Sequence, residues 1–133
     1  MTQAKRRLPY YVATGALVMA AIIGGVIYNY VQQRETRRAS ASPAERGWMA
    51  IEDHGCTSCH QGSSSFRAPT LQKLVGREIT LTSGIKIIAD EAYIRESILS
   101  PKAKISMGYA ATMPTYEGVV TDSELADIIA ALR

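Results

Sequence analysis

Residues 56–60 read Cys56-Thr57-Ser58-Cys59-His60, and this pentapeptide contains both cysteines of the 133-residue chain. Two cysteines separated by two residues and followed directly by histidine form the attachment sequence for a c-type haem. Each thiol can form a thioether to one vinyl group of the porphyrin, and the adjacent imidazole can bind the iron as the proximal ligand. The pentapeptide therefore predicts one covalently bound haem, attached through Cys56 and Cys59, with His60 on the iron.

Three other interpretations compete for the same residues. A Cys-x-x-Cys redox pair calls for a thioredoxin-like βαβ setting, which the surrounding sequence does not have. A zinc site needs further Cys or His ligands, and His54 is the only such residue outside the pentapeptide. A disulfide would close a loop of two residues and gain little entropy. The rest of the chain favours the haem interpretation.

An uncharged run, from Tyr10 to Tyr28, lies upstream of the pentapeptide. As a helix it would span about 28 Å at ~1.5 Å per residue, close to the ~30 Å of a bilayer core. Tyrosines stand at both of its ends, where amphipathic rings favour the membrane interface. We therefore predict a single transmembrane helix over residues 10–31, preceded by a cytoplasmic N-terminus (1–9). Gly24-Gly25 would allow another helix to approach closely.

A cleaved signal peptide is the competing interpretation of this run, because Ala39-Ser40-Ala41 resembles a cleavage site. The apolar run is longer than a typical h-region of about 7–15 residues, however, and the charged stretch 34–38 separates it from that site. We expect an uncleaved anchor followed by a polar tether (32–42) without periodicity. The arginines of the tether either bind anionic headgroups or are simply solvated.

Positive charge is concentrated around the apolar run. Residues 1–42 carry six Lys and Arg against Glu35, whereas residues 43–133 carry nine against eleven Asp and Glu. A basic patch with interleaved aromatics is absent, so we expect no nucleic-acid partner. Because both flanks of the run are basic, charge alone leaves the orientation open. Covalent haem attachment takes place outside the bacterial cytoplasm, which predicts an inner-membrane protein with residues 32–133 in the periplasm.

Helix start signals divide residues 43–133, whose length suits one domain. Ser42 and Glu45 form a capping box around Pro43, and Thr121 and Glu124 form a second one. Asp90 can cap a further helix that ends before Pro101.

The segments between these helices carry shorter signals. We expect loops over residues 61–70 and 101–120, and a short helix over 71–75. Residues 78–81 and 85–88 flank the turn 82–84 and predict a small β-hairpin.

Residues 44–133 resemble a class I monohaem cytochrome c, and are most similar to the cytochrome c domain fused to subunit II of some bacterial haem-copper oxidases. The resemblance implies an all-α class I cytochrome c fold with a small β-hairpin insertion, in addition to the transmembrane helix. The likeness is carried by Ala68-Pro69-Thr70-Leu71, the hairpin, residues 90–98, Pro101-Lys102-Ala103-Lys104, Gly108-Tyr109 and Met113-Pro114-Thr115-Tyr116.

The resemblance also implies roles for particular residues. Met113 would be the distal iron ligand, and Pro69 would present its carbonyl to the imidazole N–H of His60. His/Met ligation would stabilise ferrous iron and raise the potential relative to His/His. Met107 and His54 are the rival distal ligands, and we expect His54 to be a surface residue.

The chain departs from this family at several points. Ala68 stands where the family usually has glycine, and Ala131 where the last helix often has an aromatic residue. We therefore expect the crossing of the first and last helices to be loosely packed, or to be completed by Trp48 or a partner subunit. A copper-binding domain is absent, so the chain is not an oxidase subunit II itself.

The resemblance implies an electron carrier rather than an enzyme. We expect a membrane-anchored subunit of a respiratory or photosynthetic complex, with the monohaem subunit of a quinol-oxidising alternative complex III as the best candidate. The alternative is an accessory subunit of a terminal oxidase, or a tethered donor to one. A haem peroxidase or ligand sensor would need an open sixth position on the iron. The expected partners are membrane lipid, the subunits of the complex, and redox proteins that donate and accept electrons.

Overall fold

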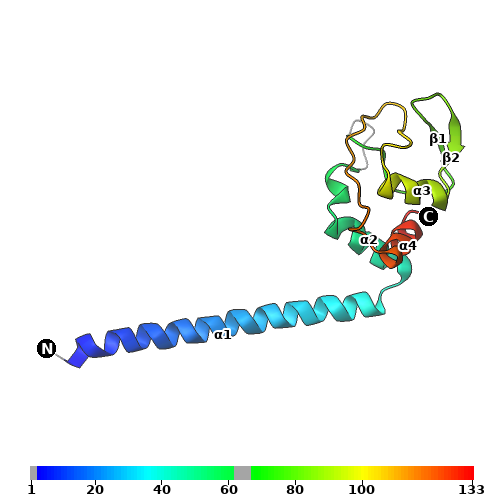
Figure 1. Cartoon of the computed structure of the whole chain (residues 1–133). Helices are drawn as coiled ribbons and strands as arrows, with labels where there is room; N and C mark the ends of the chain where they lie inside the picture. The colour runs from blue at the N-terminus through cyan, green and yellow to red at the C-terminus, as the bar shows by residue number, and fades with distance from the viewer. Residues whose placement is uncertain (1–2, 62–66) are drawn as a thin grey trace. The chain divides into compact units, whose positions relative to one another are not determined.

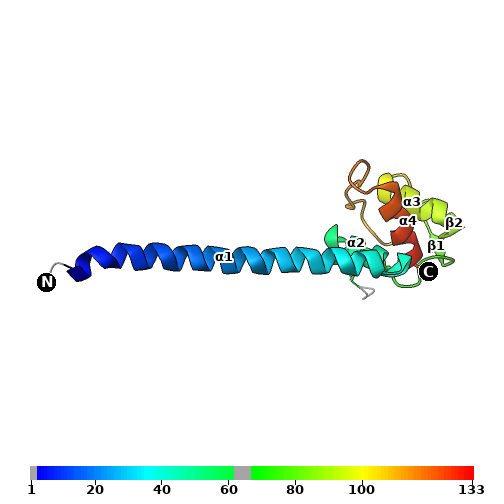
Figure 2. The same cartoon turned by 90° about the horizontal axis from the view of Figure 1, so that it is seen from below.

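The computed structural model describes residues 3–61 and 67–133, with side chains from residue 11 onward. The chain divides into two compact units, Met1–Ser40 and Ala41–Arg133. The first is one long helix, and the second combines short helices with a two-stranded antiparallel sheet (Figures 1 and 2). This confirms the predicted layout of a mostly helical chain with a small hairpin and an apolar N-terminal helix.

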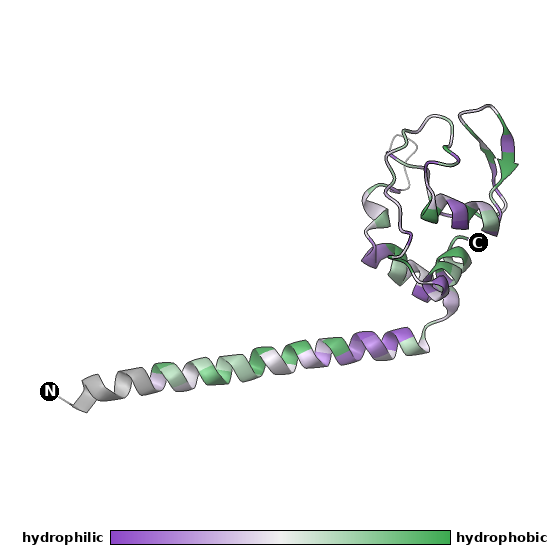
Figure 3. Ribbon diagram, in the orientation of Figure 1, coloured by the Kyte–Doolittle hydropathy of each residue, from purple (hydrophilic) through white to green (hydrophobic). Residues whose placement is uncertain are grey.

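Helix α1 (Gln3–Ser40) contains the apolar run. Most of its side chains from Tyr11 onward are exposed, including Leu17, Ile22 and Ile27. Figure 3 shows this apolar stretch giving way to hydrophilic residues before Ser40. The helix is long and apolar enough to cross a membrane once.

The predicted tether is mostly helical, because α1 continues through residues 32–40. Gln, Arg, Glu and Ala all favour helices, and residues 32–42 contain neither glycine nor proline. The non-helical connection is therefore confined to Ala41 and Ser42.

The capping signals are confirmed at all three short helices. Helix α2 (Pro43–Asp53) and helix α4 (Asp122–Ala131) both begin with complete capping boxes, at Ser42 and at Thr121. Helix α3 (Glu91–Leu99) begins where the Asp90 carboxylate accepts a hydrogen bond from the Tyr93 N–H at 2.7 Å. Each cap satisfies backbone donors that the first helical turn leaves without partners.

Helices α2 and α4 cross in close contact (Figure 1). A Cβ atom at Gly47 would stand 1.9 Å from the Asp127 carbonyl oxygen and 2.8 Å from the Ala131 Cβ. The Arg46 guanidinium donates to both carboxylate oxygens of Asp127 at 2.8 Å, and the Asp127 carboxylate raises the pKa of Arg46. The expectation of a loosely packed crossing is therefore wrong: Gly47 and Ala131 are small enough to let the two backbones meet, while Trp48 packs against the adjoining core.

Strands β1 (Glu78–Thr80) and β2 (Lys86–Ile88) form the predicted hairpin, with Ile79 opposite Ile87. Gly84 supplies the positive φ of 82° that the turn requires. A bridge between Leu81 and Ser106 joins the hairpin to the loop 101–120.

The expected helix over residues 71–75 is wrong. Two turns occupy this segment, and Lys73 has a φ of 50°, which is incompatible with a right-handed helix. The neighbouring loop prediction holds for residues 61 and 67–70, which are irregular, while residues 62–66 lie outside the described residues.

The core of the second unit lies where α2, α3 and α4 meet. Its most deeply buried large side chains are Ile51, Ile94, Leu125 and Leu132. They come from all three helices or, in the case of Leu132, from the residue that caps α4. These packed helices provide a rigid wall against which the candidate site is built.

Candidate functional site

The pentapeptide 56–60 folds into a tight turn directly after α2. Gly55 adopts a φ of 69° and redirects the chain into the 3₁₀ turn η1 (Cys56–Ser58). The Cys56 carbonyl then accepts hydrogen bonds from the N–H groups of Cys59, at 3.2 Å, and His60, at 3.0 Å. The turn holds both cysteines, half-buried and without a disulfide, next to the histidine.

The structure brings together two of the predicted site residues, His60 and Pro69. The His60 Nδ1 atom lies 2.6 Å from the Pro69 carbonyl oxygen. Because a carbonyl can only accept, this contact requires the proton on Nδ1 and leaves the lone pair on Nε2. The imidazole is therefore oriented, and its Nε2 is prepared to bind a metal.

A cavity with two lobes adjoins this imidazole. Both lobes are lined by Cys56, His60, Pro69 and Met113, while Cys59 lines the outer lobe. The inner lobe, of about 90 Å³, has several times the space that one water needs. Its wall is mainly aliphatic, from Ile51, Leu71, Leu74, Ile79, Ile94, Ile98, Val120, Ile128 and Leu132. A space of this size and polarity suits a large apolar group better than water.

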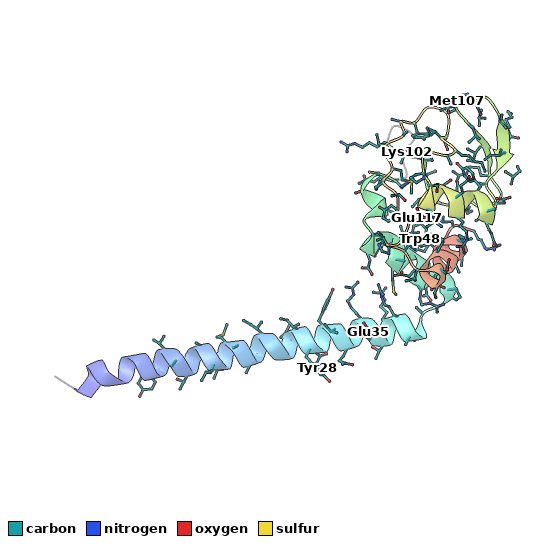
Figure 4. All side chains as sticks on the ribbon, in the orientation of Figure 1. Tyr28, Glu35, Trp48, Lys102, Met107 and Glu117 are labelled. Atoms are coloured by element: carbon teal, nitrogen blue, oxygen red, sulfur yellow. The ribbon has the colours of Figure 1, made fainter. Side chains whose placement is uncertain are left out.

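The two candidate methionines lie in different surroundings. Met113 lines both lobes of the cavity. Met107 is 53% exposed, lies outside the lining of either lobe, and donates its N–H to the Thr80 carbonyl at 2.8 Å. Figure 4 shows Met107 near the hairpin at the periphery of this unit.

His54 lines the inner lobe and is not the surface residue that we expected. Its side chain is 19% exposed, and its Nε2 lies 3.8 Å from a carboxylate oxygen of Glu124. The ring also meets the Tyr116 ring edge-on, with 6.0 Å between centroids. The side chain is covered because Tyr116, from the far end of the 101–120 loop, closes over this part of α2.

Tyr116 is a site residue to which the sequence reasoning gave no role of its own. Its hydroxyl donates to the His54 carbonyl at 3.2 Å. Burial raises the pKa of the Cys56 thiol, and a hydrogen bond with Tyr116 opposes that shift. Burial also raises the pKa of Tyr116, and the neighbouring Cys56 adds to the effect. Both groups are therefore protonated at neutral pH.

Ser97 is a second residue that the sequence reasoning missed. Its Oγ atom is buried and lacks a hydrogen-bond partner within the described part of the chain, and the residue lines both lobes. Tyr93, one turn earlier on α3, bonds through its hydroxyl to the Ser106 hydroxyl at 3.2 Å. The sequence did offer a signal for Ser97, because it places a hydroxyl between Ile94 and Ile98 on the apolar face of α3. An unpaired buried hydroxyl facing a cavity indicates that a further polar atom belongs there.

These residues fit a c-type haem. Aliphatic side chains form most of the wall of the inner lobe, and two thiols, an oriented imidazole and a thioether line the cavity. One buried hydroxyl facing it lacks a partner among the described residues. Within residues 11–61 and 67–133, no group of three or more His, Cys, Asp or Glu side chains could hold a bare metal ion. An imidazole and a thioether are the donors that hold haem iron in cytochromes c.

A scan against protein-family models finds no match to the chain, and no curated protein matches it significantly.

Proposed function

We propose that this chain is a membrane-anchored electron carrier that holds one covalently attached haem in the cavity beside η1. The observation that carries the proposal is the 2.6 Å contact of His60 Nδ1 with the Pro69 carbonyl, in the wall of a cavity that Cys56 and Met113 also line. A disulfide does not explain an imidazole oriented in this way, and a zinc site would need further ligands grouped with it, which the described residues do not offer.

Each site residue has a separate task in this proposal. Cys56 and Cys59 fix the porphyrin edge through thioethers, and His60 binds the iron through Nε2. The Pro69 carbonyl holds the ring in one orientation and increases the basicity of the imidazole. Met113 would supply a thioether as a second protein ligand of the iron, which would favour the ferrous state. When bound, the haem supplies one-electron exchange between ferric and ferrous iron.

The cavity wall controls access of water to the site. Its aliphatic lining and the cover provided by Tyr116 keep the inner lobe apolar. A dry surrounding stabilises the less charged state of the metal centre and restricts solvent entry. With Met113 in the sixth position, a small ligand would have no open site, so electron transfer is favoured over peroxidase or sensor chemistry.

The anchor gives the carrier its setting. Helix α1 is suited to hold the chain in a bacterial inner membrane, with the second unit in the periplasm, where haem is attached. Confinement to one membrane raises the effective concentration of the carrier near membrane-bound partners. We infer a subunit of a quinol-oxidising complex of the alternative complex III type, with a terminal-oxidase accessory subunit or donor as the alternative.

The first experiment expresses the full chain together with a haem-attachment system and measures the alkaline pyridine spectrum of the purified protein. We expect one haem per chain that stays attached under denaturing conditions. The double variant Cys56→Ala/Cys59→Ala should lose it, whereas the exposed Met107→Ala should keep it. Absence of covalent haem from the wild-type chain, with the attachment system active on another substrate, would refute the proposal.

Three further measurements test the class of protein, its orientation and its partners. A ferrous spectrum unaffected by carbon monoxide supports electron transfer, while rapid carbon monoxide binding supports the sensor or peroxidase alternative. Protease added to intact spheroplasts should remove the second unit, and full protection would contradict the periplasmic orientation. Co-purification from native membranes in mild detergent identifies the partner complex.

A further inference from the structure

The C-terminal part of α1 carries one basic face. Tyr30, Arg34, Arg37 and Arg38 recur at spacings of four, three and one residues, which places them on the same side of the helix. The Arg34 guanidinium carbon lies 6.0 Å from the centre of the Tyr30 ring, within range of a cation–π contact. Arg34 and Arg37 are exposed and Arg38 is half-buried.

The basic face continues an apolar one. Ile23 and Ile27, which precede Tyr30 by two turns and one turn on the same side, are 52% and 57% exposed. Figure 3 shows the change from apolar to hydrophilic residues along this part of α1. The face therefore runs from hydrocarbon-compatible side chains, through a tyrosine suited to the interface, to cations.

The spacing along the helix matches the depth of lipid headgroups. Arg34 follows Tyr30 by about 6 Å and Arg38 by about 12 Å, at ~1.5 Å per residue. The headgroup layer occupies about 5–8 Å on each side of the hydrocarbon core. Side chains on a helix tilt toward its N-terminus, so these arginines reach back toward the bilayer. Glu35 is the only carboxylate between residues 29 and 42, and the segment keeps a net charge of two positive units.

We propose that Arg34, Arg37 and Arg38 form a binding surface for the headgroup of an anionic phospholipid. Guanidinium groups bind phosphate oxygens through paired N–H donors, and three on one helix face can engage a headgroup from several sides. The proposal rests on α1 crossing a membrane and is independent of the haem. It goes beyond anchoring, because the surface selects lipids by charge.

Soluble phosphate is a poorer occupant of this surface. The arginines lie on a single helix, where Arg34 and Arg37 are exposed, so a free anion would remain largely in contact with water. A lipid phosphate is held at the interface by its own acyl chains, which lie against Ile23 and Ile27. The surface therefore suits the headgroup of a lipid better than soluble phosphate.

The test is native mass spectrometry of the full chain in detergent, with equal amounts of phosphatidylglycerol and phosphatidylcholine. Each arginine near an anionic surface changes affinity about fivefold, so we expect a preference for phosphatidylglycerol of more than about tenfold. The variant Arg34→Gln/Arg37→Gln/Arg38→Gln should bind the two lipids nearly equally. The matched control Lys73→Gln/Lys86→Gln/Lys102→Gln removes the same charge from exposed positions of the second unit and should keep the preference.

Three outcomes would overturn the proposal. The first is a triple arginine variant that retains the preference, and the second is a control variant that loses it as completely. The third is displacement of phosphatidylglycerol by inorganic phosphate. Alkaline carbonate extraction separates failure of the lipid proposal from failure of the membrane anchor. Release of the wild-type chain from membranes would overturn both the anchor and the lipid surface. A chain that stays anchored but shows no lipid preference would overturn the lipid surface alone. Far-ultraviolet circular dichroism checks that the variant keeps the helix.

Discussion

Gly47 has no side chain, and the backbone of α4 occupies the space where one would stand. Alanine there would place its Cβ 2.5 Å from the Asp127 carbonyl carbon and 1.9 Å from the oxygen. Backbone cannot move aside as a flexible side chain can, so α2 and α4 must separate. We expect Gly47→Ala to lower the free energy of unfolding by about 3 kcal/mol, at the upper end of overpacking effects.

Denaturant titration of the full chain, followed by the fluorescence of the single tryptophan, Trp48, measures this loss. Glu52→Ala, at an exposed position of the same helix, serves as the control and should change the stability by less than about 0.5 kcal/mol. Equal stability of Gly47→Ala and Glu52→Ala would show that the crossing can relax.

Met113 and Met107 provide a second test at the scale of single residues. We expect Met113→Ala to abolish the weak near-infrared band of sulfur-to-iron ligation, because Met113 lines both lobes of the cavity. Met107→Ala should leave the band and the potential unchanged, because Met107 is exposed and lies outside the cavity. Absorbance of the ferric protein records the band. Its persistence in Met113→Ala, or its loss in Met107→Ala, would assign the ligand differently.

At the scale of secondary-structure elements, the sequence correctly predicted where the three short helices begin. A cap depends on side-chain oxygens within a few residues of the backbone donors they satisfy, so it can be read from a local pattern. Ser42, Asp90 and Thr121 all cap the helices that the sequence predicted. The hairpin followed for the same reason, since Gly84 marks its turn.

Sequence reasoning failed where the structure depends on residues far apart in the chain. It also failed at residues 32–40, where no glycine or proline ends the helix and α1 continues through the expected tether. Residues 71–75 were too few for a local pattern to decide between a helix and turns. The tightness of the α2–α4 crossing depends on Gly47 lying opposite Asp127, a pairing that only the fold reveals. The sequence alone brings Cys56, Cys59 and His60 together in one turn, because they are neighbours in the chain. Ser97 and Tyr116 come next to them only through the fold.

The cap of α4 supports a prediction at the scale of this element. We expect Thr121→Ala to destabilise the chain by about 1 kcal/mol, because the Glu124 N–H loses its acceptor and the Glu124 carboxylate loses the Thr121 hydroxyl. Thr121→Ser should retain most of the stability. Thr82→Ala, at an exposed turn position, is the matched control for loss of a threonine. Denaturant titration ranks the variants, and a Thr121→Ala midpoint equal to that of Thr82→Ala would contradict the cap's contribution.

At the scale of the whole molecule, the division at Ser40 separates a helix with exposed apolar side chains from a unit that has its own buried core. The first unit contains the single helix α1 (Gln3–Ser40), whose apolar side chains are exposed and suit the hydrocarbon core of a membrane. Ala41–Arg133 contains every buried core side chain of the described residues, together with the whole lining of the cavity. Ala41 and Ser42 also remain with the second unit, and they supply an acceptor for Arg46 and the cap of α2.

This division predicts that residues 41–133, exported behind a cleavable signal peptide, form a soluble protein. If the core and cavity are complete, its free energy of unfolding should match that of the full chain within about 0.5 kcal/mol, or roughly 2–4 °C in the unfolding midpoint. The ferrous spectrum should also be unchanged, because each site residue is retained. Thermal unfolding followed by haem absorbance, in the same detergent for both proteins, makes the comparison. Gly47→Ala in the truncated chain provides a sensitivity control, since its midpoint must fall if the assay reports on the core. A truncated wild-type chain that aggregates, or melts as early as that variant, would mean that α1 contributes to folding as well as to anchoring.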